Sequence, residues 1–203
     1  MGDKWTLLII RDLAAGPRRF VELQRVLPGI STEQLRSRLN RMVADGLLTR
    51  QRYREVPPRV DYELTERSRE LMPVLGALAR WGYDWAWGAP RPGEEINVGA
   101  ILRLAPGLLE PTGGMEGSVE FVVEGEGTSP DKSYVVSVGS GQVAITERPG
   151  QETSARVAGR EAGWVAALGP EGATDGLEFR GSRGLADAIL GGYIQAARAV
   201  AAA

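Results

Sequence analysis

The chain lacks both cysteine and histidine, although it has 203 residues. Without cysteine it can form neither a disulfide nor a reactive thiol, so nothing in it requires an oxidising compartment. Without histidine it cannot build Ser-His-Asp or Cys-His catalytic sites or the usual structural zinc sites. An enzyme would have to work with carboxylates, lysines, tyrosines or a cofactor. We therefore expect no enzyme, no cofactor and no metal site.

Long hydrophobic runs are also missing. No apolar stretch approaches the ~20 residues that a helix needs to span a membrane, and no secretory signal is visible at the N-terminus. The apolar fraction of 43% is ordinary for a globular protein. The sequence therefore predicts a cytoplasmic protein with no membrane partner.

The net charge of −2 hides an uneven distribution of charged residues. Residues 1–90 carry 15 Lys and Arg against 11 Asp and Glu, a charge of +4, whereas residues 91–203 carry 9 against 15, a charge of −6. Seven arginines lie between Ser31 and Arg59. This basic patch favours a polyanion as the partner of one half only, although a solvated helix face would look the same.

The segment from Gly88 to Glu95 divides the chain. It contains two prolines, which cannot donate to a β-ladder, and two flexible glycines. The pattern before it is mostly helical, and the pattern after it consists of short alternating strands with glycine turns. We expect an α+β protein with two domains, residues 1–90 and 91–203.

Three helices are predicted at the start of the first domain. Residues 5–13 and 20–27 are bounded by Gly16-Pro17 and Pro28-Gly29. The third helix runs from Ser31, an N-cap with Gln34 as its capping-box partner, to about Asp45. One face of it is apolar, with residues at i, i+4, i+7 and i+8: Leu35, Leu39, Met42 and Val43.

The opposite face of the third helix carries groups that can read base edges or grip phosphate. At roughly 100° per residue, Ser37 lies opposite the apolar stripe. Two strands, Leu47 to Tyr53 and Val60 to Leu64, follow as a hairpin whose tip holds Pro57-Pro58-Arg59. A helix able to enter a groove, beside a basic hairpin or wing, indicates a winged helix-turn-helix. The predicted DNA contacts are Ser31, Gln34, Arg36, Ser37, Arg38, Arg41, Arg54 and Arg59.

A last long helix is predicted from Thr65 to about Trp87. It holds more aromatic surface than a small domain's own core needs. Part of that surface could form a dimer interface, and packing of the tryptophans against the second domain is about equally compatible with the pattern. The candidate dimer residues are Trp5, Leu8, Leu78, Trp81 and Trp85.

Residues 2–87 resemble the HxlR family of bacterial winged-helix transcriptional regulators. The resemblance rests on stretches that occur in the family's order: Gly2 to Ile9, Gly16 to Leu23, Leu27 to Ser31, Leu35 to Leu39, Asp45 to Leu48 and Val56 to Thr65. It implies a homodimer on a palindromic operator of double-stranded DNA, with the third helix in the major groove and the wing beside it.

The chain departs from this family in one respect. Family members usually carry a cysteine-bearing segment ahead of the Gly-Asp-Lys-Trp stretch, and this chain has no cysteine. Thiol-based sensing is therefore excluded for the chain as given. Either the signal enters elsewhere or an N-terminal segment is missing.

The second domain is predicted to be an antiparallel sheet covered on one face by helices. Strands are expected at 119–124, 134–138, 142–146, 153–158 and 177–180, and helices at 161–168 and 184–199. Residues 97–195 resemble the sterol carrier protein domain in three parts: the hairpin through Gly141, the segment around Trp164, and Leu177 to Gly181 leading into Leu185 to Leu190.

This second resemblance implies an apolar tunnel that accepts a hydrophobic effector. The candidate wall residues are Phe121, Val136, Val138, Trp164, Phe179, Ile189 and Tyr193, each of which would also serve as plain core. Two functions stay open. The first is an effector-responsive regulator, expected to be a repressor. The alternative is a lipid or small-molecule carrier whose winged helix serves for dimerisation or protein docking.

Overall fold

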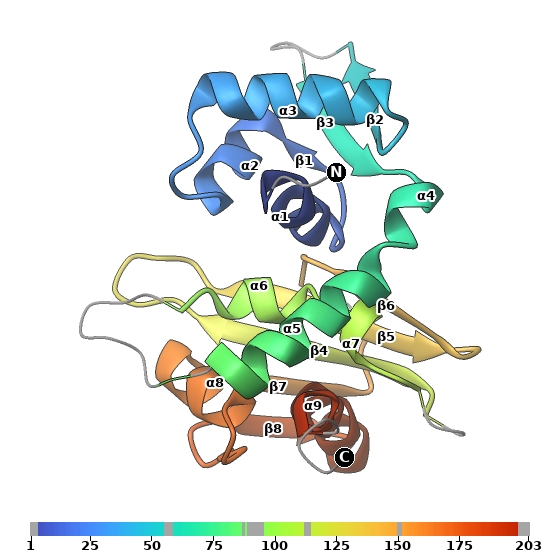
Figure 1. Cartoon of the computed structure of the whole chain (residues 1–203). Coiled ribbons are helices and arrows are strands. Elements are labelled where there is room, and N and C mark those ends of the chain that lie inside the picture. The colour runs from blue at the N-terminus through green and yellow to red at the C-terminus, as the bar shows by residue number, and fades with distance from the viewer. Residues whose placement is uncertain are drawn as a thin grey trace.

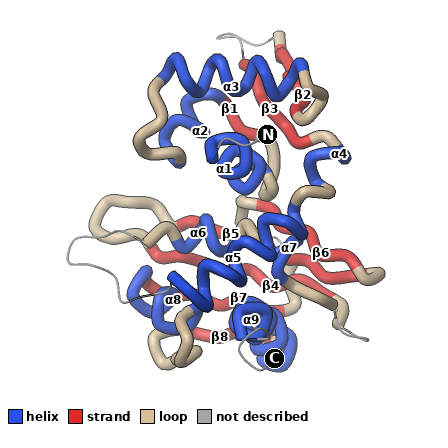
Figure 2. The backbone as a smooth tube through the Cα atoms, in the orientation of Figure 1, coloured by secondary structure: helices blue, strands red, loops and turns tan. Residues whose placement is uncertain are grey.

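The computed structural model describes residues 4–54, 59–86, 88, 96–111, 115–149 and 152–198. In Figure 1 the first half of the chain lies at the top of the view and the second half below it. Helices and strands contribute to both halves, as the tube in Figure 2 makes plain. The fold is therefore α+β, as expected. None of the helices in the described ranges is both long and apolar enough to cross a membrane.

The described part of the first half opens with three helices and a small sheet. The helices are α1 (Lys4–Leu13), α2 (Phe20–Val26) and α3 (Thr32–Ala44). We expected a two-stranded wing, but the sheet has three strands in the order β1-β3-β2: β1 (Arg18–Arg19), β2 (Leu48–Tyr53) and β3 (Arg59–Leu64). The two-residue strand β1 was missed because so short a segment carries no alternation pattern. The wing tip at 55–58, including Pro57 and Pro58, lies outside the described residues.

The predicted helix from Thr65 to Trp87 is in fact two helices, α4 (Glu66–Arg69) and α5 (Met72–Ala86). Pro73 explains the break. In the interior of one continuous helix its ring would clash with the carbonyl of Arg69, and it has no N–H to donate. At the second residue of α5 neither problem arises, because the first N–H groups of a helix have no intrahelical partner.

In its described residues, the second half is a five-stranded sheet with four helices. The strand order is β6-β5-β4-β7-β8. We expected a wholly antiparallel sheet, but β4 and β7 pair in parallel, with Val119 opposite Ala155. The elements are α6 (Val98–Leu102), α7 (Ala105–Leu108), β4 (Gly117–Glu124), β5 (Lys132–Gly139), β6 (Gln142–Thr146), β7 (Ala155–Arg160), α8 (Glu161–Leu168), β8 (Glu178–Gly181) and α9 (Arg183–Arg198).

The hairpin expected through Gly141 joins β5 to β6 by a tight turn. Gly139 pairs with Gln142, which leaves a two-residue loop. Both loop residues have positive φ, 51° at Ser140 and 73° at Gly141. Such a loop is the type I′ turn whose twist matches that of the strands. The helices α6 and α7 were not predicted, because five and four residues are too few to show a helical period.

Two hydrophobic clusters form the interior. One contains residues from Ile9 to Leu75, and the other contains Ala15 and residues from Val98 to Tyr193. The clusters meet at Leu104, which is partly buried against both. The predicted domain boundary near residue 92 lies outside the described residues. The boundary stays a prediction. The two hydrophobic clusters correspond to the two predicted domains.

Helix α5 belongs to the first half by sequence but lies across the second half (Figure 1). Its closest approach is to α7, where Gly76 faces Gly107. A Cβ on Gly76 would overlap the carbonyl of Gly107, and a Cβ on Gly107 would overlap the carbonyl of Met72. The two backbones therefore touch without intervening side chains. Only glycine permits this contact on either side.

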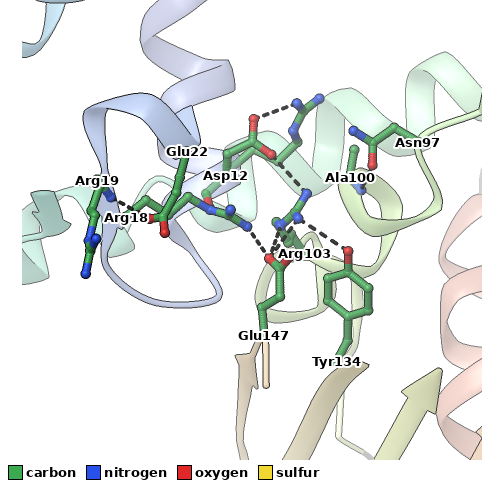
Figure 3. Close-up of polar contacts among 10 residues, drawn as sticks. Asp12, Arg18, Arg19, Glu22, Asn97, Ala100, Arg103, Tyr134 and Glu147 are labelled. Atoms are coloured by element: carbon green, nitrogen blue, oxygen red, sulfur yellow. Dashed lines mark hydrogen bonds and ion pairs between the residues drawn. The ribbon is translucent and has the colours of Figure 1, made fainter. Parts of the chain in front are cut away.

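Buried ion pairs join the two halves (Figure 3). Arg103, which caps the C-terminal end of α6, donates to Asp12 of α1 at 3.1 Å and to Glu147 at 2.7 Å. Arg18 also pairs with Glu147, whose backbone N–H donates to the carbonyl of Ala15. The side chains of Asp12 and Arg103 are 0% and 2% exposed. Burying a charged side chain is costly unless it has a partner, and these two side chains are partners of each other.

The pKa values of this cluster follow from its burial. Burial works to lower the pKa of Arg103, but the acidic groups of Tyr134, Glu147 and Asp12 outweigh it and hold the pKa above its ordinary value. Burial raises the pKa of Tyr134 to about 12, and the charge of Arg103 only partly opposes this. At neutral pH the guanidinium of Arg103 therefore stays charged and the phenol of Tyr134 stays neutral.

Candidate nucleic-acid interface

Helix α3 begins with the capping box expected from the sequence. The Oγ of Ser31 accepts from the N–H of Gln34 at 3.1 Å, and the side-chain oxygen of Gln34 accepts from the N–H of Ser31 at 3.2 Å. These bonds satisfy two backbone donors that would otherwise lack partners at a helix start. Both side chains are thus committed to the cap. Ser31 and Gln34 position the start of α3 and remain exposed there.

Helix α3 is buried along the apolar face that was predicted for it. Leu35, Leu39 and Met42 are buried in the first cluster. The other side of the helix is open to solvent, with Arg36, Ser37, Asn40 and Arg41 all exposed. This exposed face of α3 carries hydrogen-bond donors and acceptors along about two turns of the helix. It has the size and chemistry that a major groove accommodates.

Three arginines of α3 differ in how they are held. Arg36 makes a 3.3 Å ion pair with Glu33, and Arg41 makes one of the same length with Asp45. All four side chains are more than half exposed, so these pairs are weak and exchange readily for a phosphate. Arg38 is half-buried at the border of the apolar face. The structure thus brings Arg36 and Arg41 to the open face and holds Arg38 at its edge.

The wing strands present a second exposed surface. In β2 only Leu48 is buried, and the next five residues are exposed. Arg50 and Arg52 stand on the same side of that strand because strand side chains alternate. Sequence reasoning did not select these two arginines. Their i, i+2 spacing in an otherwise polar strand was the available signal.

Arg59 lies on β3 but is held by its neighbours. Its guanidinium donates to the carboxylate of Asp61, with the closest contact at 2.6 Å, and lies 5.2 Å from the ring centroid of Tyr53. Asp61 is 3% exposed, so the pair fixes the arginine against the sheet. Arg54, by contrast, is exposed just beyond β2. Arg50, Arg52 and Arg54 of the wing are therefore more accessible to a ligand than Arg59.

The predicted dimer residues fall into two groups. Trp5 and Leu8 of α1 are half-buried against the first cluster. Leu78, Trp81 and Trp85 of α5 are 51%, 61% and 75% exposed, and Val74 joins them at 51%. Trp81 and Trp85 therefore do not pack against the second half. These four residues form one stripe, the α5 stripe, along the outer face of that helix.

The predicted effector residues lie in a filled core. Phe121 and Trp164 meet edge to face with their ring centroids 5.4 Å apart, and the indole N–H of Trp164 donates to the carbonyl of Val122 at 2.9 Å. Phe179 is only partly buried. Tyr193 alone of the seven lines a cavity described below. The remaining residues are at most 4% exposed within the second cluster: Val136, Val138 and Ile189.

Similarity to known proteins is concentrated in the first half. A family model described as HxlR-like helix-turn-helix matches residues 1–89. An uncharacterised HTH-type transcriptional regulator of Synechocystis is 45% identical over 85 residues, which are 42% of this chain and 63% of the relative. This chain thus spans less than two thirds of that protein's length.

Two further relatives are matched over more of their length. An HTH-type transcriptional regulator of Methanothermobacter thermautotrophicus is 38% identical, over 47% of this chain and 72% of the relative. The regulator YkvN of Bacillus subtilis is 40% identical, over 42% of this chain and 73% of the relative.

Among solved structures, the redox regulator HypR in its reduced form is 37% identical over 40% of this chain and 80% of that chain, with a TM-score of 0.38. That score is too low to establish a fold, so the assignment rests on the sequence relatives. Through residues 1–89, the chain belongs to the HxlR-like helix-turn-helix family.

Proposed function

We propose that the protein is a DNA-binding transcriptional regulator that acts as a homodimer on a palindromic operator. The observation that carries the proposal is the exposed face of α3, on which Arg36, Ser37 and Arg41 are all open to solvent. The family relatives are named HTH-type transcriptional regulators, which supports the same role. In this proposal α3 enters the major groove and the arginines of β2 contact the flanking phosphates.

The homodimer is supported by the α5 stripe. Two tryptophans with more than half of their surface exposed are costly on a lone molecule, because apolar area gains free energy when it leaves water. A two-fold axis near α5 would pair the stripe with its copy and set the separation of the two α3 helices. A dimer bound to an operator blocks other proteins from the same DNA, so we propose repression as its effect.

We further propose that the second half receives an effector, in keeping with its resemblance to the sterol carrier protein domain. Any effector must bind one dimer geometry better than another, because a ligand with equal affinity for both shifts nothing. The buried cluster around Arg103 supports such coupling, since it ties the second half to α1. A change in the second half would thereby reach the DNA-binding half through ion pairs that cannot be broken cheaply.

DNA binding is tested by selecting operator fragments from a genomic library and measuring their affinity by fluorescence anisotropy. Replacing Arg36 and Arg38 with alanine should abolish specific binding and leave the oligomeric state unchanged. The matched control replaces Arg180 and Arg183 in the second half, which are 76% and 57% exposed. It removes the same charge and should leave the operator affinity unchanged.

Salt dependence separates the regulator from the alternative of a carrier. A regulator that contacts several phosphates loses affinity steeply as salt rises, with a log–log slope of about −0.9 for each phosphate neutralised. The Arg36 and Arg38 variant should show a shallower slope for whatever nonspecific binding remains. Absence of DNA binding at low salt, together with a hydrophobic molecule that copurifies, would favour the carrier.

A further inference from the structure

A small apolar cavity lies between α5 and the second half. Its volume is about 210 Å³, and its lining comes from α5 on one side and from α6, α7, α8, α9 and Leu104 on the other. The α5 contribution includes Ala79 and Gly82, and the opposite wall includes Leu108 and Tyr193. We call this space the α5 cavity. It is thus shared between the family domain and the second half.

The lining indicates what kind of molecule fits. It is almost entirely aliphatic and aromatic, and Arg80 is the one charged residue among the described residues that line it. Within the described part of the chain, the guanidinium of Arg80 makes one contact, from Nη1 to the carbonyl of Gly107 at 3.5 Å. That distance is at the limit for a hydrogen bond. Most of the five donors of this guanidinium therefore remain available to a ligand.

The volume of the cavity limits the size of the ligand. A cavity of about 150 Å³ lined by aliphatic and aromatic side chains accommodates benzene. A space of about 210 Å³ therefore holds one ring with a short side chain. We propose that the α5 cavity binds a small molecule with one aromatic or similar apolar body and a single carboxylate, which pairs with Arg80.

The position of the cavity gives it a consequence for assembly, and this part rests on the proposed homodimer. At roughly 100° per residue, Ala79 and Tyr83 point away from the α5 stripe, whose members lie on the opposite side of the helix. One face of α5 thus lines the cavity and the other is the proposed dimer face. A ligand that shifts α5 would change the pairing of the stripe, so ligand affinity and dimer affinity are linked.

Gly82 supplies the test of the site. It lines the cavity, and a Cβ added to it would meet no atom within 4 Å. We therefore expect the side chain of Gly82→Leu to occupy part of the cavity, and the change also favours the helix. Gly191 in α9 likewise has open space around its Cβ, but it does not line the cavity. Gly191→Leu is the matched control.

The probes are 3-phenylpropionate and its neutral analogue 3-phenylpropionamide, titrated calorimetrically into the full chain. We expect saturable binding of the carboxylate, about ten-fold tighter than that of the amide. Gly82→Leu should weaken this binding at least ten-fold and Gly191→Leu should not. Arg80→Gln should abolish the preference for the carboxylate. Equal binding by the Gly82 and Gly191 variants, or no saturable binding by the parent protein, would overturn the site.

The linkage to assembly has its own readout. Sedimentation velocity over a range of protein concentrations gives the dimer dissociation constant with and without saturating 3-phenylpropionate. We expect a shift of at least five-fold. An unchanged constant alongside Gly82-dependent binding would overturn the linkage and leave the site standing. A parent protein that sediments only as a monomer would refute the proposed homodimer, while the calorimetric result would still decide the cavity.

Discussion

Arg103 donates from Nη1 to the Oδ1 of Asp12 across 3.1 Å, although 91 residues separate the two in sequence. This ion pair spans the contact between the two halves of the protein, and both side chains are almost completely buried. It holds α1 of the family domain to the junction between α6 and α7. If this ion pair were broken, water could not solvate the charges that remain. The stability of the contact between the two halves therefore depends on the pair.

Replacing Arg103 with methionine should be strongly destabilising. The change leaves Asp12 buried with only Arg11 to balance it, and breaking a buried ion pair in this way costs about 3–5 kcal/mol. Urea denaturation measures the difference. The control is Arg180→Met, because Arg180 and Glu178 form a 3.9 Å pair with both side chains 76% exposed and such pairs contribute about 1 kcal/mol at most. Similar midpoints for the two variants would contradict this account.

Stability should fall with rising pH above about 10. Burial raises the pKa of Tyr134 to about 12 and raises that of Tyr193 further. In the unfolded chain both phenols ionise near pH 10. The stabilisation is thus complete below pH 10 and is lost as pH rises toward the folded pKa, by roughly 1.4 kcal/mol per unit for each phenol.

Chemical denaturation at several pH values between 9 and 11.5 tests this dependence. Tyr134→Phe should make the unfolding free energy fall less steeply with pH, because the contribution of one phenol is removed. Tyr193→Phe should reduce the slope in the same way, because burial also raises the pKa of that phenol. A slope that is the same in all three proteins would show that these buried phenols do not set the alkaline limit.

Gly107→Ala should separate α5 from α7. The added Cβ would overlap the carbonyl of Met72, and two backbones cannot retreat as the end of a flexible side chain can. Overpacking of this kind costs about 1–3 kcal/mol. Thermal unfolding gives the measurement. Gly191→Ala is the counterpart, since its Cβ would meet open space and helix propensity alone predicts a gain of up to about 1 kcal/mol.

Ser31→Ala should lower stability, whereas Ser37→Ala should lower only DNA affinity. The hydroxyl of Ser31 accepts from the N–H of Gln34, and loss of an N-cap costs about 1 kcal/mol. Ser37 is exposed in the middle of the same helix. Denaturant midpoints of both variants measure the change in stability, and operator affinities measure the change in DNA binding. A cap loss that leaves the midpoint unchanged would argue that α3 is held by packing alone.

Local patterns determined most of the elements. The capping box at Ser31 and Gln34, the apolar stripe of α3 and the two-residue hairpin at Ser140-Gly141 all act within a few residues of chain. Their outcome follows from helix period, side-chain alternation and turn chemistry, which need no distant partner. The outward position of Ser37 and Arg41 follows from the same periodicity.

The sequence alone determined that this chain has a basic helix and hairpin, an acidic second half and no thiol or imidazole chemistry. Only the tertiary structure decided that β4 and β7 run in parallel and that Arg103 reaches Asp12. It also decided which side of α5 carries exposed tryptophans and which side lines a cavity. The reason is physical: periodicity states that a side chain lies on a face, whereas its partner there depends on contacts between segments far apart in the chain.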